Sequence, residues 1–156
     1  MKARGRLAHW IAIAIFMFLP VAAVAQERAD VDKAIAANVG QPAKVLSFIA
    51  ELRHAVAKHD APAVAARVSY PITVNPRTNK AMRIRTPEAF VASYERIVTP
   101  HIAKVIEDQK YEQLFVNYQG AMFGSGEVWI ADICKDKECR QSEIKIKTIQ
   151  NTAGSK

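Results

Sequence analysis

The chain is poor in the residues that mark common catalytic and metal sites. Its 156 residues include only two cysteines and four histidines, and these make no metal-ligand spacing. No arrangement of serine, histidine and aspartate supports a nucleophilic triad. The glycines at 120, 124 and 126 lie between expected strands, whereas a phosphate-binding loop precedes a helix. These absences argue against the motif-defined hydrolases, nucleotide-binding proteins and metalloenzymes, and they predict no catalytic residue, no metal and no cofactor.

Long apolar runs are also missing, except at the N-terminus. Three basic residues, with no acid, precede an apolar run that ends at Pro20. Ala23 and Ala25 then place small side chains where signal peptidase reads them. The apolar core has about ten residues, whereas a membrane-spanning helix needs about 20. We therefore expect residues 1–25 to be a secretory signal peptide, cleaved after Ala25, and the mature protein to be periplasmic and without a stable membrane anchor.

The excess of positive charge becomes small once this peptide is removed. The whole chain has 22 basic and 15 acidic residues, and three basic residues precede the expected cleavage point. The mature chain would hold 19 basic residues against the same 15 acids, a net charge of +4 instead of +7. So mild an excess predicts no nucleic-acid partner. A small apolar ligand or a component of the cell envelope stays open as a partner.

The two cysteines flank a short polar loop. Cys134 and Cys139 enclose Lys135 to Glu138, between two strand-like stretches. In an exported protein this spacing is typical of a disulfide that closes a hairpin. The chain-entropy contribution of so short a loop is about 2 kcal/mol, so the bridge is expected to fix the hairpin more than the whole fold. A redox site and a recognition finger that enters an enzyme cleft are the alternatives.

Helical patterns dominate the first two thirds of the mature chain. The alanine-rich residues 26–41 predict an arm or a short helix that ends at Gly40. A helix is predicted from Pro42 to Lys58, and capping residues predict further helices after Asp60, Thr86 and Thr99. A continuous apolar stripe over residues 90–98 predicts a single helix there.

Strand patterns occupy two regions. Residues 72–74 and 82–85 are expected to pair across a turn, and period-two alternation returns after residue 111. There the expected strands are 114–118, 121–123, 127–133 and 143–149, with a hairpin turn at Gly124-Ser125-Gly126. Helices separated in sequence from an antiparallel sheet are typical of the α+β class, with the N-terminal helices packed on one face of a curved sheet. We expect one domain over residues 42–150 and a flexible tail over 151–156.

Two stretches resemble a known superfamily. The first is Thr-Pro-Glu-Ala-Phe at 86–90, followed by Tyr94 and Thr99-Pro100, and the second covers 114–120 and 124–130. With the cysteine hairpin they resemble small exported bacterial proteins of unassigned function, whose organisation is similar to the nuclear transport factor 2-like, or cystatin-like, superfamily. The resemblance spans residues 43–150 and implies a curved sheet around a helix, enclosing a cone-shaped cavity. The superfamily includes isomerases, dehydratases and binding domains, so the resemblance does not choose a function.

If the cone forms, alternate residues of the late strands should line it. Glu127 and Trp129 share one strand face, and a carboxylate beside a tryptophan has surroundings that suit a proton carrier. The position of Glu127 beside the Gly126 turn nevertheless favours a solvated strand end. The hydroxyls of Tyr70, Tyr94 and Tyr118 could donate to a ligand oxygen, although such residues are more often core aromatics. Arg83 and Arg85 share a strand face that could hold an anion or a peptidoglycan carboxylate, although a solvated sheet face is the commoner role.

Three functions stay open at this point. The first expectation is a non-enzymatic exported module that binds a ligand or a protein, because no polar residues converge in a recognisable catalytic pattern. A small-molecule isomerase or dehydratase would use Glu127 or Asp132 as an acid–base carboxylate inside the cone. An inhibitor of an exported hydrolase would insert the disulfide loop into the cleft of its target.

Overall fold

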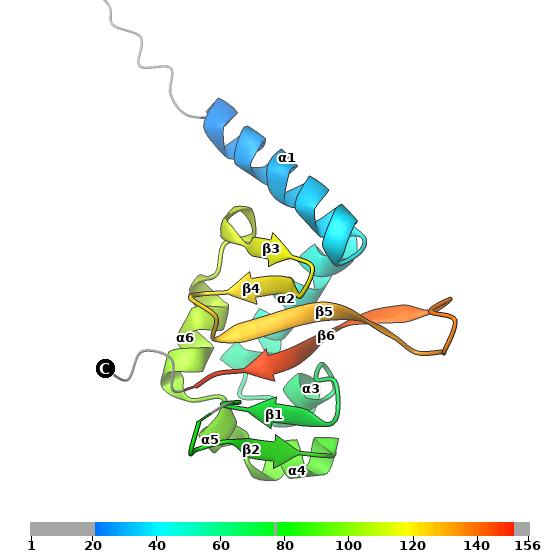
Figure 1. Ribbon diagram of the computed structural model, residues 1–156. Helices are drawn as coiled ribbons and strands as arrows, with labels where there is room; N and C mark the ends of the chain where they lie inside the picture. Colours follow the sequence, from blue (N-terminus) through cyan, green and yellow to red (C-terminus); the bar gives the residue numbers. More distant parts are fainter. Residues whose placement is uncertain (1–20, 77, 152–156) are drawn as a thin grey trace, which may run out of the picture.

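A computed structural model describes residues 21–76 and 78–151 of the chain (Figure 1). Most of the expected signal peptide, residues 1–20, and residues 152–156 of the expected tail lie outside this part. The elements follow one another in this order: α1 (Val21–Asn38), α2 (Pro42–Ala57), α3 (Ala61–Ala65), β1 (Ile72–Val74), β2 (Met82–Ile84), α4 (Pro87–Ala92), α5 (Tyr94–Ile97), α6 (Pro100–Asp108), the 3-10 helix η1 (Tyr111–Gln113), β3 (Phe115–Asn117), β4 (Gly120–Phe123), β5 (Val128–Cys134) and β6 (Ser142–Ile149).

The strands form one mixed sheet in the order β2-β1-β6-β5-β4-β3. All neighbouring strands are antiparallel except β1 and β6, which pair in parallel at Val74 and Ile149. The chain leaves the β1–β2 hairpin, passes through α4 to η1 and enters the sheet again at its far edge. The antiparallel meander from β3 then brings β6 back beside β1. The expected antiparallel sheet is therefore mixed, because the β1–β2 hairpin and the β3–β6 meander meet at one parallel pair.

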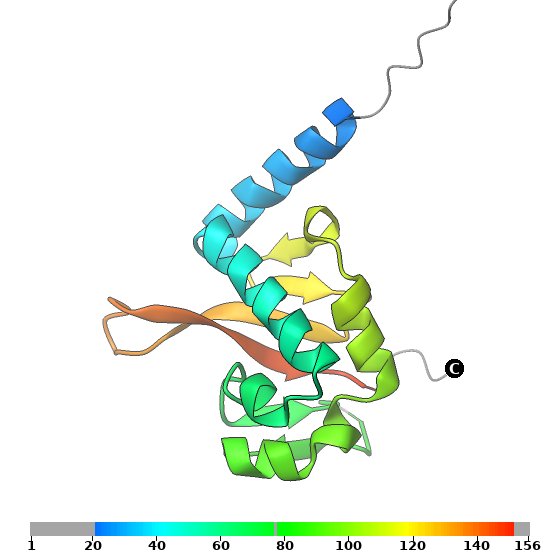
Figure 2. The ribbon, with the colours of Figure 1, turned by 180° about the vertical axis from the view of Figure 1, so that it is seen from behind.

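Helices α2 to α6 cover one face of this sheet (Figure 2). Alternate strand residues such as Val128, Ile130 and Ile146 are fully buried, as residues that face a helical layer should be. The large side chains of Phe90 and Phe123 are also completely buried in the same core. The α+β class is confirmed, and the sheet stays open without closing into a barrel, which is consistent with a cone-like fold.

Local capping chemistry begins three helices where the sequence predicts. The side chains of Asp60, Thr86 and Thr99 accept hydrogen bonds from backbone N–H groups three residues ahead, at the starts of α3, α4 and α6. The single helix expected over 90–98 is wrong, because the chain breaks at Ser93. The break turns the backbone, and Phe90 in α4 and Tyr94 in α5 are both buried.

Helix α1 is longer than expected and packs against the sheet edge. Its side chains Val31 and Ile35 are buried, and it lies beside η1 and β3. The Tyr111 hydroxyl donates to the Asp32 carboxylate, and the Arg28 guanidinium lies 5.4 Å from the centre of the Tyr111 ring. These contacts all lie after the expected cleavage point at Ala25, which falls inside α1. Among the described helices, none has the length and apolar character needed to cross a membrane.

Candidate functional site

Strands β5 and β6 extend beyond the rest of the sheet. Strand β4 pairs with β5 only as far as Ile130, whereas β5 and β6 continue to pair with each other up to Cys134 and Ser142. The resulting hairpin, residues 132–144, projects away from the body of the molecule (Figures 1 and 2). We call residues 132–144 the arm. Most of its side chains are exposed, so the core contributes little to holding its shape.

The tip of the arm is fixed by covalent and polar contacts. A disulfide joins Cys134 and Cys139, as the sequence predicts. The Asp136 carboxylate accepts hydrogen bonds from the backbone N–H groups of Arg140, at 2.9 Å, and Gln141, at 3.0 Å. The backbone of Lys135 also donates to the carbonyl of Gln141 at 2.8 Å. These bonds constrain the backbone of the loop, although the loop buries very little surface.

A groove of about 600 Å³ lies at the base of the arm, between α2, the segment after α3 and the start of β6. Its size is within the range of about 300–1,000 Å³ that is usual for binding pockets. Phe48 and Ile144 supply buried apolar surface in the groove. Lys44, Glu51 and Arg67 add charged groups to its lining. The groove therefore combines an apolar floor with a charged rim.

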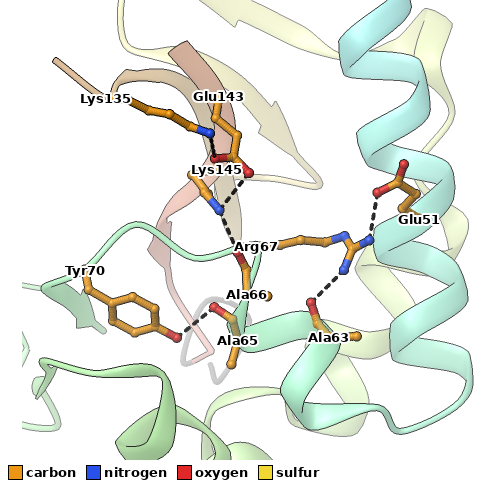
Figure 3. Close-up of polar contacts among 9 residues, drawn as sticks. All are labelled: Glu51, Ala63, Ala65, Ala66, Arg67, Tyr70, Lys135, Glu143 and Lys145. Atoms are coloured by element: carbon orange, nitrogen blue, oxygen red, sulfur yellow. Dashed lines mark hydrogen bonds and ion pairs between the residues drawn. The ribbon is translucent and has the colours of Figure 1, made fainter. Parts of the chain in front are cut away.

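Arg67, which lines the groove, bonds to both α2 and α3 (Figure 3). Its guanidinium donates to the Glu51 carboxylate of α2 and to the carbonyl of Ala63, each at 2.7 Å. Its backbone carbonyl accepts from the N–H of Ile146 at 2.8 Å, which fixes the segment to β6. The buried Nε of Arg67 has no hydrogen-bond partner among the described residues. The guanidinium is thus held in place at the groove, with its buried Nε–H left without a partner among the described residues.

Glu143 anchors the base of the arm. Its carboxylate lies 2.9 Å from the Lys135 ammonium and 3.0 Å from that of Lys145 (Figure 3). Hydrogen bonds from these two ammonium groups hold the pKa of Glu143 below its usual range. Lys145 also donates to the carbonyl of Ala66 at 2.6 Å. The arm, the segment after α3 and the groove therefore belong to one polar network.

Glu127 is not the solvated strand end that we expected. Its side chain is only 7% exposed, and one carboxylate oxygen lies 3.3 Å from His101 Nε2 of α6. The other oxygen accepts from the backbone N–H of Ser125 at 2.5 Å. Glycine suits position 124 in this turn, because its φ is +61° and a Cβ there would overlap the same carboxylate oxygen. The turn folds back over its own glutamate, so both oxygens bind the protein.

The other candidates do not meet in one pocket. Tyr70 is half-buried, and its hydroxyl donates to the carbonyl of Ala65 at 3.0 Å (Figure 3). Tyr94 is buried, Tyr118 is 85% exposed, and Trp129 is half-buried next to Phe115. The remaining candidates and the second acid–base carboxylate are exposed: Arg83, Arg85 and Asp132. Asp132 accepts from the Ser142 hydroxyl on the arm, so it does not join Glu127 in a shared cavity.

Sequence reasoning did not find the residues of the groove. Glu51, Arg67 and Glu143 come from three separate elements, and no local motif links them. In the described part of the chain, no three histidine, cysteine, aspartate or glutamate side chains are placed to hold a metal ion. Comparison of the chain with protein-family models, with curated proteins and with solved structures finds no match. The superfamily resemblance therefore stays a prediction.

Proposed function

We propose that this protein is an exported, non-enzymatic module that binds another protein through the arm. The observation that carries the proposal is the fixed shape of an arm that buries little surface of its own. An isolated two-stranded hairpin is marginally stable in water, so such a projection needs additional bonds to stay ordered. The disulfide and the Asp136 hydrogen bonds supply them. Order of this kind lowers the entropy lost on binding.

The groove at the base of the arm extends the same contact surface. Lys145 and Glu143 connect the arm to the segment that carries Arg67, so a partner seated on the arm would lie next to the groove. The apolar floor at Phe48 and Ile144 would bury surface, and the charged rim would fix the orientation of the partner. A protein segment that carries apolar and charged side chains matches this lining.

The proposal of export rests on the N-terminal sequence pattern, and the disulfide agrees with it. Disulfides persist in oxidising compartments and are rare in the cytosol. Signal peptide cleavage after Ala25 would leave Gln26 as the first residue, and the α1 contacts of Arg28 and Asp32 would remain. Mass spectrometry of the protein from a periplasmic fraction tests this step. A mature mass that starts at Gln26 supports export, and an intact N-terminus in the cytosolic fraction contradicts it.

Site-specific crosslinking tests the binding function. A photoreactive residue in place of Lys137, at the arm tip, is expected to give a discrete crosslinked product in the periplasm. The same residue in place of Arg85, which is also exposed and basic but lies after β2, serves as the matched control. Replacing both Cys134 and Cys139 with serine should reduce the product without unfolding the protein. Equal crosslinking from positions 137 and 85, or no product from either, would contradict the proposal.

Inhibition of an exported hydrolase is a second candidate, favoured by the narrow and cross-linked tip. Lys137 and Glu138 lie at the turn of the loop, and both are exposed. The protein would then inhibit one member of a panel of cell-wall hydrolases such as lysozymes. The double variant Lys137→Ala/Glu138→Ala should lose this inhibition, whereas Lys33→Ala on α1 should keep it. Inhibition that survives the double variant would exclude the loop as the inhibitory element.

A further inference from the structure

The face of the sheet opposite the helices carries a row of large apolar side chains. In the strand register, Phe115 lies opposite Met122, and Met122 lies opposite Trp129. Their sequence neighbours Ala121 and Ile130 are buried on the helical side, so the row points to the other face. In the described part of the chain no helix covers that face (Figure 1). Phe115 is 53% exposed there.

Trp129 lies in a hollow of about 390 Å³ on this face. Its neighbours there come from β6, from the segments that follow β1 and β6, and from the β3–β4 turn: Pro76, Gln119, Lys147, Thr148 and Gln150. Trp129 contacts Phe115 edge to face, with ring centres 6.5 Å apart, which limits the motion of the indole. The Lys147 ammonium donates to the carbonyl of Gln119 at 2.6 Å and holds the β3–β4 turn against the hollow.

The polar side chains of the hollow are available for a ligand. The side-chain amides of Gln119 and Gln150 and the hydroxyl of Thr148 make no hydrogen bond within the described chain. An amide both donates and accepts, and so does a hydroxyl. Among the residues that the structure describes, Lys147 is the one charged side chain that lines the hollow. Such a lining suits an uncharged ligand that carries several hydroxyl groups.

We infer that the hollow around Trp129 is a saccharide-binding site. A pyranose ring has an apolar face of C–H groups and a rim of hydroxyl groups that both donate and accept. The indole of Trp129 matches the apolar face, and the two glutamine amides match the rim. A polyanionic nucleic acid would need many more cations than Lys147, the one that the described residues place there. A lipid chain would leave the amides without partners at a cost in free energy. This site is separate from the arm and goes beyond the proposed protein-binding function.

Tryptophan fluorescence offers a direct test, because the chain has only two tryptophans. In the expected mature protein, which begins at Gln26, all tryptophan emission comes from Trp129, and the Trp10→Phe substitution gives the full chain the same property. Titration with the β-1,4-linked tetramer of N-acetylglucosamine and with cellotetraose is expected to give a saturable change in emission with at least one of them. Co-sedimentation with purified peptidoglycan distinguishes a cell-wall glycan from a free oligosaccharide as the source of the sugar.

Amide variants separate specific binding from general quenching. Gln119→Ala and Gln150→Ala should each raise the dissociation constant about fivefold, which is the loss of affinity expected for one hydrogen bond. Gln113→Ala, an exposed glutamine away from the hollow, should leave it unchanged. In calorimetry, Trp129→Ala should abolish binding. If the Trp129→Ala protein does not fold, the affinities of the two glutamine variants still test the saccharide site.

The result that overturns the inference is the absence of any saturable change up to about 10 mM saccharide. Equal affinities of the Gln119→Ala, Gln150→Ala and Gln113→Ala proteins would overturn it as well. The Cys134→Ser/Cys139→Ser protein should bind the saccharide as the unmodified chain does. Failure of the arm proposal and failure of the saccharide proposal are therefore distinguishable.

Discussion

At the residue scale, Glu127 connects a β-turn to a helix 26 positions away in sequence. The carboxylate is buried, contacts His101 of α6 and accepts from the Ser125 N–H. A buried charged group is tolerated only when it is paired and hydrogen-bonded, and both carboxylate oxygens meet this condition. These contacts account for the burial of the Glu127 side chain.

Replacing this carboxylate should destabilise the fold. Glu127→Ala removes an acceptor from the Ser125 N–H and from His101, so we expect a loss of about 2 kcal/mol in the free energy of unfolding. Urea denaturation followed by circular dichroism measures it. Glu138→Ala, an exposed glutamate on the arm, should change stability by less than about 0.5 kcal/mol. Equal stabilities of the two variants would contradict the structural role.

The raised pKa of the Tyr70 phenol predicts that the free energy of unfolding changes at alkaline pH. Burial, helped by the nearby Glu88 carboxylate, raises the pKa of the Tyr70 phenol to about 12, from an ordinary value of about 10. A raised pKa means that the folded state favours the protonated phenol, which donates to the Ala65 carbonyl. Its stabilising contribution is therefore complete below pH 10 and is lost as the pH rises towards 12.

The comparison with Tyr70→Phe isolates this contribution. The stability difference between the unmodified protein and the Phe variant should be constant below pH 10 and should shrink between pH 10 and 12. Chemical denaturation at a series of pH values gives the difference directly, and the phenolate absorbance near 295 nm reports ionisation. A difference that stays constant across this range would show that the hydroxyl is not held in its protonated form.

At the element scale, the arm and the core should respond differently to loss of the disulfide. The bridge closes a loop of six residues, and chain entropy predicts that closing such a loop stabilises the ordered form by about 2 kcal/mol. Because most side chains of the tip are exposed, the Cys134→Ser/Cys139→Ser protein should lose arm order with little change in the core. Limited proteolysis should then cut within residues 135–141 faster, while the urea midpoint moves slightly. A large fall in the midpoint would mean that the arm is part of the core.

Helix α1 should unfold together with the rest of the domain. Ile35 is fully buried where α1 meets η1 and β3, so Ile35→Ala should cost about 3 kcal/mol. Lys33→Ala, exposed on the opposite side of the same helix, serves as the control. Urea denaturation compares the two variants. A change below about 0.5 kcal/mol for Ile35→Ala would show that α1 is not docked.

At the scale of the whole molecule, the features that sequence predicted are those set by nearby residues. The caps at Asp60, Thr86 and Thr99 depend on a side chain and an N–H three residues away, and the disulfide closes a short loop. Alternation of apolar residues similarly predicted the late strands. These local rules were sufficient for the α+β class.

The features that sequence did not predict depend on contacts between distant segments. The parallel pairing of β1 with β6 joins residues 74 and 149, and Arg67 meets Glu51 and β6 only after α3 is placed. Burial of Glu127 likewise requires His101 of α6 above the turn. The groove and the two faces of the sheet are consequences of this assembly. No spacing within one segment encodes them.

The order of the arm in solution tests the central claim most directly. The proposal requires a binding surface that is already formed in the free protein, with the tip held by the disulfide and by Asp136. We predict backbone ¹⁵N order parameters of about 0.8 or more for residues 135–141 in the free protein, close to the value for rigid backbone. Values below about 0.6, typical of a flexible loop, would contradict the account.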